Sequence, residues 1–181
     1  RLVHDLWGES PPGRPLNTLQ TKLSQLRRVL GPGRVVHGAG GYRLEVDPED
    51  VDSIRFEDLV ERADAASGPA SRTALASCAL DLWRGEPFPE LSDVPSTGAE
   101  AARLDELRLS AREIRAEAYL DLGESCCAAA DTADLLAEHP LREHARSLHM
   151  LALYREGRQG EALASYCLLY TSDAADDSLR V

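Results

Sequence analysis

The sequence predicts a mainly α-helical protein that contains one short β-hairpin. Residues 15–46 combine a leucine-striped helix with two short β-rich runs around a cluster of glycines. Residues 53–166 have helical periodicity throughout, and related positions recur 34 residues apart. Hydrophobic residues make up 43% of the 181 residues and charged residues 28%, which is the composition of a folded globular protein. No apolar run approaches the roughly 18 residues that a bilayer span needs, so we expect a cytoplasmic protein.

Residues 1–7 are predicted to be the last turns of a helix whose beginning is missing, which indicates a fragment. Leu2, Val3 and Leu6 form an apolar stripe with no cap before it. Gly8 and the prolines of ESPPG end the helix, because consecutive prolines lack amide donors and restrict the residue before them.

A strongly amphipathic helix is predicted over residues 15–30. Its leucines recur at intervals of three and four and form one apolar stripe, the leucine stripe: Leu16, Leu19, Leu23, Leu26 and Leu30. Beyond Gly31-Pro32-Gly33, RVV and YRLEV flank HGAGG, which predicts a β-hairpin with a glycine-rich tip. A polar-faced helix followed directly by a hairpin is the order of recognition helix and wing. We therefore assign residues 1–46 to an incomplete winged helix-turn-helix with a C-terminal β-hairpin wing.

The charge distribution supports two modules with different partners. Residues 1–46 carry seven basic and three acidic residues, a net charge of +4, whereas the remainder carries 13 basic and 28 acidic residues, a net charge of −15. A basic module suits double-stranded DNA. Arg, Lys, Asn, Gln and Thr pair with base edges in the major groove, and flanking arginines hold phosphates. The predicted DNA-binding residues are Arg14, Asn17, Thr18, Thr21, Lys22, Gln25, Arg28, Arg34, His37 and Arg43.

Residues 47–52 form an acidic linker, and residues 53–166 are predicted to be an all-α domain. Apolar residues in helical phase mark its first three helices: Phe56, Leu59, Val60 and Ala63; then Leu75, Cys78, Ala79 and Leu82; then Leu104, Leu107, Ala111, Ile114 and Ala118. Three shorter helices are expected near 124–138, 141–156 and 158–170.

An internal repeat lies in the last part of this domain. Gly123 and Gly157 are separated by 34 residues, the period of TPR repeats, and the pairs Ala118/Ala152 and Ala128/Ala162 keep the same register. Pro140 and Tyr166 also stand where TPR repeats place a proline and an aromatic residue. We therefore expect TPR-like stacking, in which small residues let antiparallel helices approach closely.

Neither a metal site nor an enzyme is expected. The four cysteines form no CxxC pair, and His139, His144 and His149, spaced by five residues, turn about 140° per step and cannot share a helix face. HGAGGY lacks both the P-loop lysine and a GxGxxG helix start, so no nucleotide cofactor is implied.

These motifs also resemble those of a known protein family. LVHDLWGESPPGRPLNTLQTKLSQLRRVLGPGRVVHGAGGYRLEV resembles the second half of a response-regulator-type winged helix. DLWRGEPFPEL, EAARLDELRLSAREIRAEAYLDLG and LLAEHPLREHARSLHMLALYREGRQGEAL resemble a bacterial transcriptional activator domain. That order is similar to the SARP-like (antibiotic regulatory protein) activators. The resemblance implies activation of transcription, often of secondary-metabolite clusters, by binding direct repeats in promoters, with self-association, as in a homodimer, or regulation through the helical domain. It also implies a loop that contacts RNA polymerase: Glu9, Ser10, Pro11, Pro12 and Gly13.

The chain departs from that pattern in three places. The first sheet and helix of the winged helix are not represented, and the wing tip HGAGGY lacks the usual basic residue. After about Tyr166, CLLYTSDAADDSLRV has no helical stripe and resembles translated adaptor sequence, so we expect residues 167–181 not to be native. One alternative stays open: a TPR-type protein-interaction scaffold that does not bind DNA.

Overall fold

The computed structural model describes residues 2–91 and 94–167, without the side chains of residues 95 and 96. The first unit contains α1 (Leu2–Trp7), α2 (Pro15–Leu30), β1 (Val35–Gly38) and β2 (Gly41–Leu44). A 3-10 turn, η1 (Pro48–Asp50), leads into α3 (Asp52–Ala65), α4 (Pro69–Leu80), a second 3-10 turn η2 (Pro89–Leu91), α5 (Pro95–Leu122), α6 (Ser125–Glu138) and α7 (Glu143–Arg155). Residues 159–167 are also helical. The rest of the predicted 158–170 helix and of the 167–181 tail lies outside the described residues.

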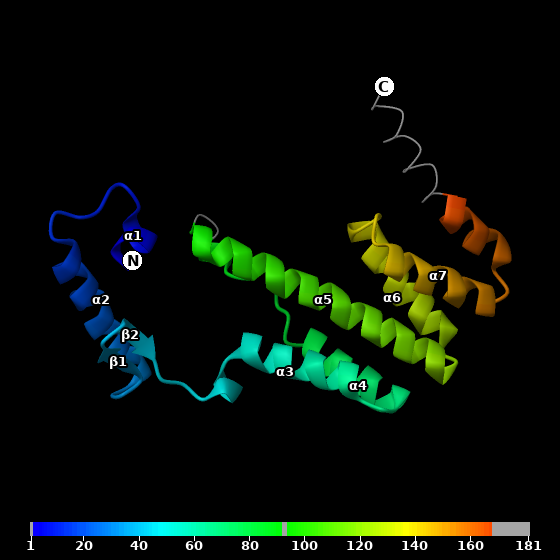
Figure 1. The fold of residues 1–181 in the computed structure, drawn as a ribbon, viewed down its shortest axis with the longest axis horizontal. Coiled ribbons are helices and arrows are strands. Elements are labelled where there is room, and N and C mark those ends of the chain that lie inside the picture. The colour runs from blue at the N-terminus through cyan, green and yellow to red at the C-terminus, as the bar shows by residue number, and fades with distance from the viewer. Residues whose placement is uncertain (1, 92–93, 168–181) are drawn as a thin grey trace, which may run out of the picture.

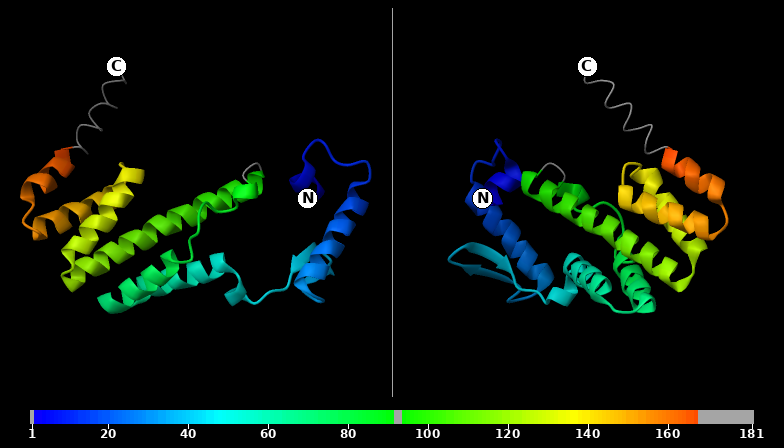
Figure 2. Two further views of the ribbon diagram at one scale, coloured as in Figure 1. Left: turned by 180° about the vertical axis from the view of Figure 1, so that it is seen from behind. Right: turned by 45° about the vertical axis from the view of Figure 1, so that its right-hand side comes forward.

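The two predicted modules lie at opposite ends of an elongated molecule (Figure 1). The small unit of α1, α2 and the hairpin is joined by the segment around η1 to the helical part, along which α5 runs (Figures 1 and 2). α3 and α4 pack along α5 as far as its end, where Arg72 of α4 pairs with Glu117, and α6 and α7 also pack on α5. The mainly α-helical fold class is confirmed. Within the described residues, no helix is long and apolar enough to cross a membrane.

α2 has the bounds that its sequence predicts. Proline begins it, in the first turn, where the missing amide hydrogen costs nothing. At its end Gly31 has a φ of 92° and donates its N–H to the carbonyl of Arg27. Leu19 and Leu23 are buried against Val35 of β1. These contacts hold the helix on the hairpin.

Only the centre of the leucine stripe is buried. Leu16 is 66% exposed, and Leu26 and Leu30 are also exposed. The described residues therefore bury two of the five leucines, and the periodic pattern alone overestimates how much of the helix is covered in this chain.

The hairpin tip is shorter than predicted. Val35 pairs with Leu44 and Gly38 with Gly41 in antiparallel register, so the strands extend into the HGAGG segment and leave Ala39 and Gly40 as the turn. Gly41 has a φ of 113°, a conformation that side chains rarely adopt. The glycines thus belong partly to the strands, which the pattern of residue types did not indicate.

The first helices of the all-α part form one core. Phe56, Val60, Ala79, Leu104 and Ala111 are buried together, from α3, α4 and α5. α4 differs in detail from its prediction. Its buried residues are Ala76 and Ala79, whereas Cys78 is exposed. α4 also ends at Leu80, so Leu82 lies in the following turn and not in the helix.

The 34-residue repeat is visible in the backbone. Gly123 and Gly157 have φ values of 79° and 75°. In the first turn the N–H of Glu124 bonds to the carbonyl of Tyr119 at 2.8 Å, and in the second the N–H of Arg158 bonds to that of Leu153 at 2.9 Å. Both turns end a helix with the same bond pattern.

Small residues at repeated positions let the helices of these turns pack closely. The core between the end of α5, α6, α7 and the last helix contains Ala116, Leu120, Ala128, Ala129, Leu148, Ala152, Leu153 and Ala162. TPR-like stacking is therefore confirmed over α5–α7 and residues 159–167.

Candidate nucleic-acid interface

The polar face of α2 forms a row of exposed side chains. Asn17, Thr21, Gln25 and Arg28 are all exposed and, at about 100° per residue, lie on one side of the helix. Lys22 is exposed beside this row. Neither Lys22 nor Arg28 forms an ion pair with any residue in the described ranges. The face opposite the buried leucines is therefore polar, cationic and unobstructed, which is what major-groove contact requires.

Two threonines on this helix are partly occupied by local hydrogen bonds. The hydroxyl of Thr18 donates to the carbonyl of Arg14 at 3.1 Å, and that of Thr21 donates to the carbonyl of Asn17 at 3.0 Å. Such bonds to the preceding turn are common for threonine in helices. Their hydroxyl oxygens keep acceptor capacity, and their methyl groups are left to contact other groups. Among the predicted DNA-binding residues of α2, Asn17, Gln25, Lys22 and Arg28 are therefore the better candidates to donate hydrogen bonds to a ligand.

The predicted phosphate ligands of the wing are engaged with neighbouring acids. Arg43 forms an ion pair with Glu45. Arg34 lies 3.9 Å from the carboxylate of Asp50 and donates to the carbonyl of Glu45 at 3.5 Å. All these side chains are substantially exposed. Because exposed pairs contribute only about 0–1 kcal/mol, a phosphate can replace the carboxylate at little cost.

His37 lies on the wing beside Tyr42, with the ring centroids 4.8 Å apart in an edge-to-face arrangement. Arg14 is exposed immediately before α2. The structure thus brings the predicted residues to two adjacent surfaces, one on α2 and one on the hairpin.

Arg27 holds these two surfaces together, and sequence reasoning missed it. Its Nε–H donates to the carbonyl of Val35 at 3.0 Å, and its guanidinium lies 5.7 Å from the ring centroid of Tyr42. Arg27 therefore joins α2 to both strands of the hairpin. Its position in the sequence could have indicated this role, because Arg27 lies beside the leucine stripe of the helix and away from the polar row.

The predicted polymerase-contact loop connects α1 to α2. Its residues are exposed apart from the half-buried Pro12. Two backbone bonds shape its start: the N–H of Gly8 donates to the carbonyl of His4 at 2.7 Å, and that of Ser10 donates to the carbonyl of Trp7 at 3.0 Å. The loop is a surface on which another protein can dock without disturbing the buried residues of α2.

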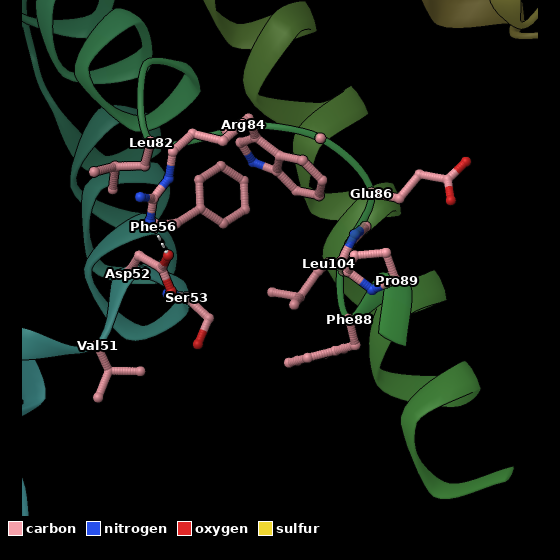
Figure 3. Close-up of a pocket in the computed structure, with 13 residues that line it drawn as sticks. Val51, Asp52, Ser53, Phe56, Leu82, Arg84, Glu86, Phe88, Pro89 and Leu104 are labelled. Carbon is pink, nitrogen blue, oxygen red and sulfur yellow. Dashed lines mark hydrogen bonds and ion pairs between the residues drawn. The ribbon is translucent and has the colours of Figure 1, made fainter. Parts of the chain in front are cut away.

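A hollow lies where the linker enters the helical part. It has a volume of about 480 Å³ and is lined by Phe56, Trp83, Phe88 and Leu104, among others. Across it, Arg84 reaches from the α4–α5 loop to the carboxylate of Asp52 at 2.7 Å (Figure 3). This ion pair holds the first residue of α3, where the first unit is attached. No cluster of three or more metal-ligating side chains occurs in the part of the chain that the structure describes.

Comparison with known proteins identifies the family. The family model described as "Bacterial transcriptional activator domain" matches residues 51–174. "Regulatory protein AfsR" of Streptomyces coelicolor is 43% identical over 171 residues, which cover 91% of this chain and 17% of that protein. "Regulatory protein DnrI" of Streptomyces peucetius is 37% identical over 183 residues, which cover 93% of this chain and 67% of that protein.

A solved structure supports the same assignment. It is titled "Mycobacterium tuberculosis EmbR in complex with low affinity phosphopeptide", and it matches 97% of this chain and 48% of its own chain with a TM-score of 0.86 and 29% sequence identity. The chain thus spans about half of that structure and about a sixth of the AfsR protein. The chain belongs to the bacterial transcriptional activator domain family, which confirms its resemblance to the SARP-like activators.

Proposed function

We propose that this chain is the DNA-binding and helical portion of a cytoplasmic SARP-like transcriptional activator that acts on a secondary-metabolite gene cluster. The exposed row on α2 carries the proposal. Asn17, Gln25 and Arg28 present amide and guanidinium groups in line along one side of a helix, opposite the leucines that fix that helix on the hairpin. A helix of this kind fits the major groove, where such groups discriminate between base pairs.

The hairpin then contacts the backbone beside the groove. Arg34 and Arg43 exchange Asp50 and Glu45 for phosphates, and Arg14 holds a phosphate at the start of α2. These contacts orient the protein without selecting a sequence. Residues 47–181, with a net charge of −15, are repelled by DNA, so that DNA approaches the first unit only.

The remaining surfaces have separate roles in this proposal. The loop from Glu9 to Gly13 contacts RNA polymerase, and the TPR-like helices mediate self-association, so that two copies occupy the direct repeats of one promoter. The family assignment favours this function over a scaffold without DNA binding, because the relatives that match are named regulatory proteins.

The test uses the intact natural protein. Sequences are selected from random double-stranded DNA, and the affinity for the selected site is measured by fluorescence anisotropy over a series of salt concentrations. We expect one preferred sequence and a steep fall of affinity with salt, because bound phosphates release counterions. Equal, weak affinity for all sequences, or none, would refute DNA recognition and leave the scaffold.

A further inference from the structure

The segment that joins the hairpin to α3 brings acids to the predicted phosphate ligands of the wing. Asp50, the last residue of η1, has its carboxylate 3.9 Å from the guanidinium of Arg34, which directly precedes β1. Glu45, at the other end of the same segment, pairs with Arg43 of β2. Both arginines therefore contact an acid of residues 45–50, here called the acidic strap.

The backbone of Arg34 is held by the hairpin. The N–H of Glu45 donates to the carbonyl of Arg34 at 2.6 Å, which extends the strand pairing one step beyond Val35 and Leu44. The guanidinium of Arg34 also donates to the carbonyl of Glu45 at 3.5 Å. Its side chain nevertheless stays 46% exposed. A ligand that approaches from solvent can therefore reach it.

The carboxylate of Asp50 is presented by a hydrogen-bonded turn. The N–H of Asp50 donates to the carbonyl of Asp47 at 2.9 Å, and the carboxylate of Asp47 accepts the N–H of Glu49 at 3.1 Å. Two residues further along, Asp52 is paired with Arg84 of the α4–α5 loop at 2.7 Å. Asp50 thus stands between a turn that positions it and a helix whose first residue is anchored.

A carboxylate and a phosphate compete for the same guanidinium. Both present anionic oxygens that accept charge-assisted hydrogen bonds from arginine. The side chains of Arg34 and Asp50 are 46% and 63% exposed, so their contact is reversible and screened by salt. An exposed pair of this kind changes an equilibrium constant by up to about fivefold. The contact is therefore strong enough to lower DNA affinity and too weak to prevent DNA binding.

We propose that the acidic strap is an intramolecular competitor of DNA, in which Asp50 occupies Arg34 in the free protein and a DNA phosphate displaces it. The contact is autoinhibitory, because DNA must break the pair before Arg34 can hold a phosphate. The inference rests on the proposed DNA-binding function and adds a regulation of the same site.

The competition links DNA binding to the position of the helical part. Asp50 precedes Asp52 by two residues, and Asp52 is anchored to the helical part through Arg84 (Figure 3). A partner that shifts the helical part and draws Asp50 away from Arg34 therefore raises the affinity for DNA. Because such coupling is reciprocal, DNA favours the same displacement of the strap.

The test compares Asp50→Asn with a matched control, Glu49→Gln, in the intact natural protein. Each substitution removes one negative charge from the same turn, and Glu49 is exposed and has no ion pair with a residue that the structure describes. Fluorescence anisotropy at low salt measures the Kd for the selected DNA site. We expect Asp50→Asn to lower the Kd about two- to fivefold more than Glu49→Gln does, because only Asp50 competes for Arg34.

Repeating both substitutions in an Arg34→Gln background isolates the contact. There Asp50→Asn and Glu49→Gln should have equal effects, because the group for which Asp50 competes is gone. An advantage of Asp50→Asn that persists in this background overturns the proposal.

The same measurements separate failure of the competition from failure of DNA binding. Equal effects of Asp50→Asn and Glu49→Gln with Arg34 present, while Arg34→Gln alone weakens binding, overturn the competition and leave the proposed function intact. Binding that Arg34→Gln leaves unchanged overturns the phosphate contact of Arg34 and, with it, the competition.

Discussion

Arg112 and Arg146 occupy equivalent places in two successive repeats, and each donates to a backbone carbonyl 19 residues further along the chain. Arg112 bonds to the carbonyl of Asp131 at 3.3 Å and Arg146 to that of Ser165 at 3.1 Å. Both arginines are buried. A guanidinium that joins the two helices of a repeat at the same point in both layers shows that the period extends to specific polar contacts, beyond the alanines and glycines.

The repeat predicts equal costs at its two glycine turns. Gly123→Ala and Gly157→Ala each put a side chain at a positive φ, although nothing lies within 4 Å of the added carbon in either case. Each change is therefore expected to cost about 1–2 kcal/mol, from backbone strain alone. Urea unfolding of both variants measures this. Costs that differ by several kcal/mol between the two would show that the turns are not equivalent.

The contact of α2 with the hairpin is expected to depend on the buried leucines. Leu23→Ala removes a buried side chain beside Leu19 and Val35 and should cost on the order of 2–5 kcal/mol. Leu16→Ala, at a position that is 66% exposed, is the matched control and should cost far less in this chain. Thermal unfolding followed by circular dichroism compares them. Equal losses would contradict the burial of Leu23.

The lowered pKa of His149 predicts that the helical part loses stability in mild acid. Burial lowers the pKa of His149 from its usual 6.5, and the nearby Arg158 and Arg146 lower it further, whereas a backbone hydrogen bond at Ala129 and the charge of Glu161 act in the opposite direction. The unfolded chain therefore takes up this proton more readily than the folded one. Stability is full above about pH 6.5 and falls as the pH drops below that value.

The measurement is the free energy of unfolding at several pH values between 7 and 5. His149→Gln should flatten the decline over this range, because the titrating group is gone, while His139→Gln at an exposed position serves as the control. An identical decline in the wild type and His149→Gln would assign the acid sensitivity to other groups.

Arg27 is expected to act on DNA affinity through the wing. Arg27→Gln removes the charged donor to Val35 and the contact with Tyr42, so the hairpin is held less firmly against α2. Affinity for DNA should fall while its dependence on salt stays the same, because no phosphate contact is lost. A salt slope reduced by about one unit would instead show that Arg27 holds a phosphate.

The sequence predicted some elements better than others, because the residues that determine an element's bounds or burial are local in some cases and distant in others. The bounds of α2 follow from local information, since Pro15 and Gly31 begin and end it. The turns at Gly123 and Gly157 follow from periodicity. The exposure of Leu16 and Leu26 does not follow from periodicity, because periodicity shows which face of a helix is apolar but not whether another element covers that face.

Within the candidate site, the polar row of α2 was predictable from the sequence, but the contacts that hold α2 and the hairpin together were not. Asn17, Gln25 and Arg28 lie where the 3.6-residue period puts them. The link from Arg27 to Val35, and the pairing of Arg34 with Asp50, depend on how the hairpin folds back against the helix. Contacts between residues that are distant in the sequence cannot be inferred from the order of residue types. The role of these residues in DNA binding stays a prediction.

The most direct test of the account is the affinity of the intact protein for its selected DNA site after changes on the polar face of α2. Lys22→Ala and Arg28→Ala should each weaken binding by roughly 1–3 kcal/mol. Arg55→Ala, an exposed arginine of α3 outside this face, should bind as the wild type does. Affinities unchanged by both α2 substitutions would contradict the assignment of α2 as the recognition helix.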